Sequence, residues 1–407
     1  MRRNPIGRVL SLLTMLAVVT SALSLARAKY ITSNVAHWST WYMLQEDLIL
    51  LNTAQDATKK TLKKGWWAIF VRGAQGGHRW GQNATASDHK TGDGGAGGVV
   101  MFARYFSAAT DVYCWVGGGG GAYRFKPANP SVGGGKCNTN DNGSNDAVWG
   151  GGNGGGASVL AFTNTLPTNE DNLLVVAAGG GGGAGGNGAK ATGASAGSVI
   201  WPFTPDDSVS AYTSTSAQTT DTRFKGGGVI WRGYRGNGNT ASYQGNNGDG
   251  GGAALNGGGA SGGTTPVDAG FLSGANSKAG WAAGGGGGFW GGGGGYDNNG
   301  SGGSGACYLR LVNSKTLATK TTDTNYAYTI GIPTGGPYSY AYNYFYNTFG
   351  GANSYQAVNH AATAAEATAS QYYNGTICMI YMGDFDINGS GFGTAGGPMI
   401  NTQGNPY

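Results

Sequence analysis

The chain has 407 residues, of which 82 are Gly, against a usual share of about 7%. Only 11% of the residues are charged and the formal net charge is +5, yet 11 Trp, 22 Tyr and 13 Phe are present. This composition argues against a disordered chain, which is rich in charge and poor in aromatic residues.

Residues 1–28 predict a signal for export. They hold four arginines and no acidic residue around the apolar run Val9–Leu25, and they end in the small-residue sequence ARA. This pattern is typical of a secretory signal cleaved before Lys29. A membrane anchor is the alternative, but the apolar run is short for a span. Without the four arginines, 21 of the 25 basic residues remain against 20 acidic ones. We therefore expect a secreted or cell-surface protein without a nucleic-acid-binding surface, and no membrane span in the mature chain.

Strand signals begin at residues 65–77, GWWAIFVRGAQGG, where an apolar run ends in glycine. Three later segments, at 97–121, 155–183 and 303–336, share one plan: glycine, an apolar run, a polar connection, a second apolar run and glycine again. Such runs of β-branched and aromatic residues between turn signals predict strands, and each segment predicts a β-hairpin. Residues 376–383, TICMIYMG, predict a closing strand.

These eight strands indicate an all-β fold, a jelly-roll-like β-sandwich. Residues 41–52 add either a strand or a short helix, and the Ala-rich segment 356–370 predicts one short α-helix near the C-terminus. We expect a lead-in segment at 29–64 and a glycine-rich sandwich at 65–310. A hairpin, helix and closing strand at 311–407 would complete that sandwich.

Long glycine-rich connections at 117–156, 179–305 and 335–353 separate the strands. A tether would be featureless, but aromatic residues interrupt these segments, as in GGGGGFWGGGGGY. Glycine can pack as a threefold extended helix that rises about 3.1 Å per residue, with its backbone polar groups pointing sideways. We therefore expect an inserted bundle of polyglycine-type extended helices.

The ordered set KKGWWAIFVRGAQGG, WVGGGGG, GGGNGGGASVLAF, LLVVAAGGGGGAGG and GGFWGGGGGY resembles a known domain. It is similar to the glycine-rich extracellular domain of anaplastic lymphoma kinase and leukocyte tyrosine kinase receptors, over about residues 64–309. Glycine-rich tips of phage tail fibres are more distantly similar. The resemblance implies a jelly-roll-like sandwich with inserted polyglycine helices, and extracellular recognition in place of catalysis. The chain shows no kinase signature, so the receptors' hormone-binding role is not transferred to its residues.

Catalytic patterns are weak throughout the sequence. Two segments, GASAG at 193–197 and GASGG at 259–263, fit a nucleophile elbow, but neither follows a predicted strand. The three glutamates, Glu46, Glu170 and Glu366, form no pair suited to glycoside hydrolysis. We expect no catalytic residue, and a secreted hydrolase is the least favoured alternative.

The segment Asp384–Gly389, DFDING, matches the opening of a calcium loop, with Asp384, Asp386 and Asn388 as candidate ligands. The twelfth position is Ala395, so the usual bidentate glutamate is missing. The favoured interpretation is a strand and turn without an ion. We therefore expect no cofactor, and calcium at this loop is the alternative.

Four cysteines, Cys114, Cys137, Cys307 and Cys378, would form two disulfides in an oxidising compartment. We expect the pairs Cys114–Cys137 and Cys307–Cys378. Their spacing does not suit a zinc site. Five N-glycosylation sequons occur, at Asn83, Asn142, Asn299, Asn374 and Asn388.

These observations favour an exported, non-enzymatic recognition or adhesion protein that binds an extracellular protein or a glycan on a cell surface. Tyr and Trp suit such surfaces because each offers a large apolar area with a polar group. Candidate binding residues are Phe289, Trp290, Trp231 and Tyr234, with one of Phe289 and Trp290 buried and the other presented. The alternative is a self-associating structural subunit of a cell wall, matrix or filament.

Overall fold

The computed structural model describes a set of segments within the chain. They are residues 47–78, 80–81, 93–121, 132–137, 149–184, 192–196, 199–200, 211–212, 228–231, 233–234, 236, 269–277, 282–295, 300–310, 329–330, 332, 339–349 and 374–384. The chain divides into two compact units, Met1–Ile49 and Leu50–Tyr407, and nearly all described elements belong to the second. The predicted export signal at 1–28 and the predicted helix at 356–370 lie outside the described residues. Within the described part of the chain, no helix is long and apolar enough to cross a membrane.

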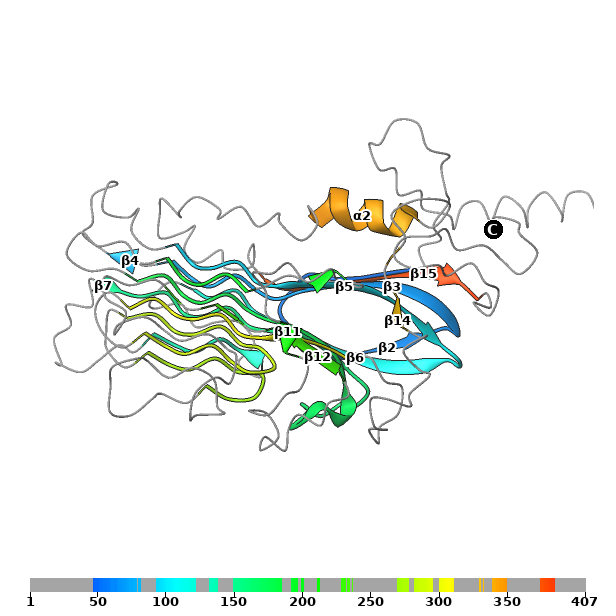
Figure 1. The fold of residues 1–407 in the computed structure, drawn as a ribbon, viewed down its shortest axis with the longest axis horizontal. Helices are drawn as coiled ribbons and strands as arrows, with labels where there is room; N and C mark the ends of the chain where they lie inside the picture. Colours follow the sequence, from blue (N-terminus) through cyan, green and yellow to red (C-terminus); the bar gives the residue numbers. More distant parts are fainter. Residues whose placement is uncertain are drawn as a thin grey trace, which may run out of the picture. The chain divides into compact units, whose positions relative to one another are not determined.

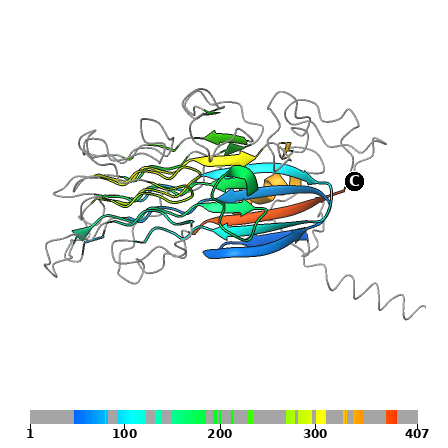
Figure 2. The ribbon, with the colours of Figure 1, turned by 90° about the horizontal axis from the view of Figure 1, so that it is seen from below.

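Most of the regular structure is β-sheet, in two main sheets (Figure 1, Figure 2). The first sheet has six strands, which in spatial order are β1 (Leu48–Leu51), β15 (Thr376–Gly383), β3 (Gly65–Arg72), β5 (Val99–Phe106) and β10 (Val199–Ile200), with β14 (Thr329–Ile330) also paired to β5. The second has seven, in the order β11 (Ala211–Tyr212), β12 (Gly228–Trp231), β13 (Cys307–Arg310), β9 (Leu173–Ala177), β8 (Ser158–Ala161), β6 (Thr110–Val116) and β2 (Gln55–Leu62). A two-stranded ribbon joins β4 (Trp80–Gly81) to β7 (Trp149–Gly150).

The two main sheets pack against each other. Strands β3 and β5 contact β9, β3 contacts β8, and β15 contacts β6. Strand β3 is buried along almost its whole length because its other face is covered by helix α2 (Ser339–Phe349). Phe70 of β3 stacks on Phe349 of α2, with ring centroids 4.7 Å apart, and lies 5.4 Å from Phe345.

Only one of the three predicted hairpins forms. Strands β8 and β9 pair antiparallel, which confirms the hairpin predicted at 155–183. The hairpins predicted at 97–121 and 303–336 are wrong, because β5 and β6 belong to different sheets, as do β13 and β14. A short polar connection between two apolar runs also suits a chain that crosses from one sheet to the other, so the pattern alone did not distinguish the two.

For residues 41–52 either a strand or a short helix is expected, and their described part forms a strand, β1. Helix α2 lies in the segment 335–353 that was expected to be a glycine-rich connection. Ala341, Phe345 and Phe349 recur every four residues, which places them on one helical face, and Ala341 and Phe345 are fully buried.

The glycine-rich segments that connect the strands along the chain lie side by side and form what we call the glycine array (Figure 1). Its members hydrogen-bond to one another through backbone N–H and C=O groups. The segments are residues 73–77, 93–98, 117–121, 132–137, 151–157, 178–184, 192–196, 270–277, 282–288, 291–295 and 300–306.

Hydrogen bonding in the array repeats every three residues. In segment 151–157 the N–H groups of Gly152 and Gly155 both donate to segment 178–184, at 2.8 Å each. The next residues along, Asn153 and Gly156, both donate to segment 117–121, and Gly154 and Ala157 both donate to segment 132–137. Each step of three residues therefore returns to the same neighbour.

Two segments of the array are surrounded by six others. Segment 178–184 donates hydrogen bonds to three neighbours, which are 282–288, 73–77 and 192–196. It accepts hydrogen bonds from three more, which are 93–98, 151–157 and 300–306. Segment 282–288 likewise donates to 300–306, 151–157 and 270–277, and accepts from 178–184, 132–137 and 291–295. The backbone of both segments is thus enclosed on all sides.

Close packing in the array excludes side chains. A Cβ placed on Gly286 would overlap the carbonyl oxygen of Gly179, and one on Gly182 would overlap that of Gly152. The obstructing atoms belong to the backbone, so a change of rotamer gives no relief. Only glycine, which has no Cβ, therefore fits at positions 182 and 286.

We predict that Gly286→Val destabilises the protein by at least about 1–3 kcal/mol, the usual cost of overpacking. Thr168→Val, at an exposed position between β8 and β9, provides the control. Urea unfolding followed by Trp fluorescence measures both free energies of unfolding. Equal stability of the two variants would contradict the packed array.

Candidate functional site

The glycine array extends from one end of the two sheets. Strands β3, β6 and β9 run directly into array segments, whereas β5, β8 and β13 each begin directly after one. Because adjacent strands are antiparallel, these six junctions lie at the same end. The opposite strand ends, where β3 begins and β15 finishes, form a second location with clustered polar groups.

Phe289 and Trp290, the first two candidate binding residues, are both buried. The ring of Phe289 stacks on Tyr308 of β13 with centroids 4.8 Å apart, and it meets Phe271 edge-on at 5.0 Å. The main chain is held as well, because the Phe289 N–H donates to the Ala306 carbonyl at 2.8 Å. The expectation that one of the pair is presented is therefore corrected: both belong to a hydrophobic cluster on the second sheet.

The other two candidates differ from each other. Trp231 is buried at the end of β12, so the prediction that it lies on a binding surface is wrong. Tyr234 is 38% exposed. Its N–H donates to Ser304 Oγ at 2.7 Å and its carbonyl accepts from the Ser304 N–H at 3.0 Å. Tyr234 is thus a partly exposed aromatic residue whose backbone is fixed to the array.

We predict that Phe289→Ala lowers the free energy of unfolding by about 3–5 kcal/mol, because it removes a buried ring that three aromatic residues contact. Tyr234→Ala should stay within about 0.5 kcal/mol of the wild type, as surface substitutions usually do. Urea denaturation measures both. A neutral Phe289→Ala would contradict the described core.

Two buried asparagines bind array segments through their side chains. Asn153 Nδ2 donates to the Gly121 carbonyl at 2.9 Å, and its Oδ1 accepts from the Cys137 N–H at 2.8 Å. Asn374 Oδ1 accepts from the Gly119 N–H at 2.9 Å. Asn374 also belongs to a glycosylation sequon. Its side chain is buried and hydrogen-bonded to Gly119, so the folded protein does not expose this asparagine for glycosylation.

A charged cluster lies in the core, which the sequence reasoning missed. Arg104 of β5, Arg310 of β13 and Glu170 are all buried. Arg310 Nη1 donates to the carbonyls of Glu170 at 2.7 Å and Asp171 at 2.8 Å, and so satisfies the end of a short 3₁₀ helix at Glu170–Asn172. The sequence signal for this cluster is an arginine inside each of two apolar runs, VVMFARYF and CYLR. The contacts describe a structural role.

The predicted disulfides are also corrected. All four cysteines are buried thiols, and neither Cys114–Cys137 nor Cys307–Cys378 is joined. Cys307 lies on β13 of the second sheet, whereas Cys378 lies on β15 of the first. Burial raises the pKa of the Cys114, Cys137 and Cys307 thiols to about 12, which disfavours the reactive thiolate.

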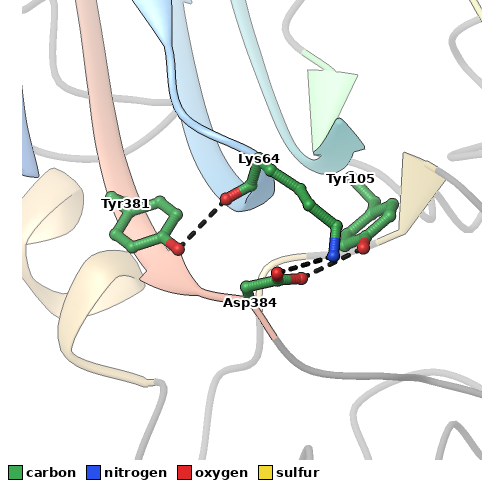
Figure 3. A network of polar contacts seen from close by, with 4 residues as sticks. All are labelled: Lys64, Tyr105, Tyr381 and Asp384. Carbon is green, nitrogen blue, oxygen red and sulfur yellow. Dashed lines mark hydrogen bonds and ion pairs between the residues drawn. The ribbon is translucent and has the colours of Figure 1, made fainter. Parts of the chain in front are cut away.

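The polar cluster at the opposite strand ends centres on Asp384 (Figure 3). Lys64 Nζ lies 2.8 Å from Asp384 Oδ2, and Tyr105 donates its hydroxyl to Asp384 Oδ1 at 3.0 Å. Tyr381 donates its hydroxyl to the Lys64 carbonyl at 3.1 Å. The cluster therefore joins the start of β3 to the end regions of β5 and β15.

The candidate calcium ligands are only partly described. Asp384 is in the cluster, whereas Asp386 and Asn388 lie outside the described residues. Both carboxylate oxygens of Asp384 already contact protein groups, so a cation would have to displace the Lys64 ammonium. Among the described residues, no group of His, Cys, Asp and Glu side chains could hold a metal ion.

The hydrogen bond from Lys64 lowers the pKa of Asp384 from its ordinary value, with a smaller contribution from Tyr105. The same contact raises the pKa of Lys64. A carboxylate with a lowered pKa stabilises the folded state above its unfolded pKa of about 3.9. That stabilisation is lost as the pH falls through the folded pKa.

We predict that Asp384→Asn lowers the melting temperature slightly at pH 7, and that the difference from the wild type disappears as the pH falls below about 4. The effect is small because the pair is largely solvent-exposed. Asp56→Asn, which removes an exposed carboxylate from β2, controls for net charge. Scanning calorimetry from pH 2 to 7 measures the difference, and a difference that persists at pH 2 would contradict the ion pair.

The chain matches no protein-family model, and no curated protein is significantly similar to it.

Proposed function

We propose that the protein is an exported, non-enzymatic recognition or adhesion protein whose glycine array serves as a rigid scaffold at the cell surface or outside the cell. This proposal is supported by the hydrogen bonding of the array, which repeats every three residues. Segments 178–184 and 282–288 each hydrogen-bond to six neighbouring segments. A backbone fixed in this way presents side chains in fixed positions. Such preorganisation reduces the entropy lost on binding.

The same repeat supports a finer description of the fold. A polyglycine-type helix has three residues per turn, so its N–H groups point in three directions and return every third residue. We propose that the array is a bundle of such helices, inserted into a jelly-roll-like sandwich. On this proposal the similarity to glycine-rich receptor domains reflects a shared architecture.

Tyr234 is the candidate contact residue that best fits a recognition role. It is partly exposed, and Ser304 holds its backbone on both sides. An aromatic ring with a hydroxyl group offers apolar area and a hydrogen bond together. An extracellular protein or a cell-surface glycan is the class of partner that we propose.

A structural subunit is the second candidate function. Burial of Phe289, Trp290 and Trp231 favours it, because these aromatic residues stabilise the scaffold instead of displaying a surface. The edge strand β2 opposes assembly by strand addition, because it carries Lys59 and Lys60, and charged edges disfavour edge-to-edge pairing.

Binding of the purified, fluorescently labelled exported protein to a panel of cells tests the proposal. We expect saturable binding, and we expect light scattering to show that the protein that binds is a monomer. Tyr234→Ala should weaken it about tenfold, a loss of roughly 1.4 kcal/mol. Tyr234→Phe and the exposed control Asn164→Ala should retain it. Filament formation without saturable cell binding would instead support the structural subunit.

A further inference from the structure

A second exposed aromatic surface lies on helix α2, away from the array. The helix has the sequence SYAYNYFYNTF and contains no charged residue. Its buried stripe, Ala341 and Phe345, faces Phe70 of β3. A solvent-facing helix surface usually bears charged side chains. The exposed face of α2 is uncharged.

The exposed face presents two tyrosines and two asparagines. Tyr342 and Tyr346, one turn apart, have nearly parallel rings, with an interplanar angle of 18° and centroids 6.2 Å apart. Tyr346 is 56% exposed, and Asn343 and Asn347 are exposed beside the two rings. We call these four residues the tyrosine ridge. The mutual contact of the rings restricts their rotamers before any partner binds, which lowers the entropic cost of binding.

The chemistry of the tyrosine ridge selects a neutral partner. The face of an aromatic ring is electron-rich, so it attracts the polarised C–H bonds on one face of a sugar ring. An asparagine amide both donates and accepts hydrogen bonds, as vicinal hydroxyl groups require. The ridge contains neither a cation to bind a sulfate or carboxylate nor an anion to bind a basic peptide.

The size of the surface favours a glycan over a protein. A helix of 11 residues is about 16 Å long and about 10 Å wide, so one face offers roughly 160 Å². A stable protein interface buries about 800 Å² on each partner. The helix face alone offers only a fraction of that area, and its length suits a short oligosaccharide.

We propose that the tyrosine ridge of α2 binds neutral oligosaccharides by stacking sugar rings on Tyr342 and Tyr346 while Asn343 and Asn347 bond their hydroxyls. This inference rests on the proposed recognition function and names a partner class for it. It places glycan binding on a surface distinct from Tyr234.

The test uses the full exported chain on an array of neutral oligosaccharides of glucose, galactose, mannose and N-acetylglucosamine, three to five sugars long, alongside heparin fragments and sialylated glycans. We expect binding to a subset of the neutral glycans. Tyr346→Ala should weaken it about tenfold, and Tyr342→Ala with Tyr346→Ala should abolish it. Tyr346→Phe, which keeps the ring, should retain most of the affinity.

Leu50→Ala is the matched control, because it removes an exposed apolar side chain from β1 and should leave glycan binding unchanged. Melting curves confirm that each variant is folded. Absence of neutral-glycan binding, equal binding by the double variant, or binding of anionic glycans alone would overturn the proposal. So would a Tyr346-dependent dimer seen by light scattering. Cell binding that survives the double variant but not Tyr234→Ala would reject the ridge while keeping the recognition function.

Discussion

The structure depends on backbone hydrogen bonds between glycine segments that approach too closely for any side chain. Where a Cβ would stand on Gly286, the carbonyl oxygen of Gly179 already lies. Glycine loses about 0.5–1 kcal/mol more than alanine when its backbone is ordered, whereas a typical intramolecular hydrogen bond contributes about 0.5–1.5 kcal/mol. The two terms are similar in size, so the array is stable only if nearly every N–H and C=O group in its centre is paired. This condition explains why segments 178–184 and 282–288 are each enclosed by six neighbours.

The array and the sheets form one continuous interior built in two different ways. The sheets bury side chains, as the fully buried strand β9 shows, and the array continues the same segment by burying backbone. Residues at the junction combine both modes. Phe289 stacks on Tyr308 while its own N–H bonds to Ala306, and Asn374 accepts from Gly119 just before β15 begins. Aromatic residues within glycine runs therefore anchor the array to the second sheet.

Apolar runs predicted most of the long strands, including β3, β5, β6, β9 and β15, and the interrupted glycine runs predicted ordered packing. Strand pairing was harder to predict from the sequence. The connection after β5 has the same polar character as a hairpin turn, although it crosses to the other sheet. Strand β2 was missed because it is an exposed edge rich in polar residues. The surroundings of two candidate residues were inaccessible for a related reason: burial of Trp290 and contact of Asp384 with Lys64 depend on segments far apart in sequence. A single sequence contains no local signal for either.

The order of the array segments along the chain has a consequence for how the protein reaches its folded state. Segment 178–184 receives hydrogen bonds from residues as early as Gly95 and as late as Gly305. Its enclosure therefore waits until more than two hundred residues between these points have been synthesised. Contacts of such long sequence separation slow folding, because loop closure must precede any stabilising contact. The segment can therefore be fully enclosed only after the last of these glycine segments has been synthesised.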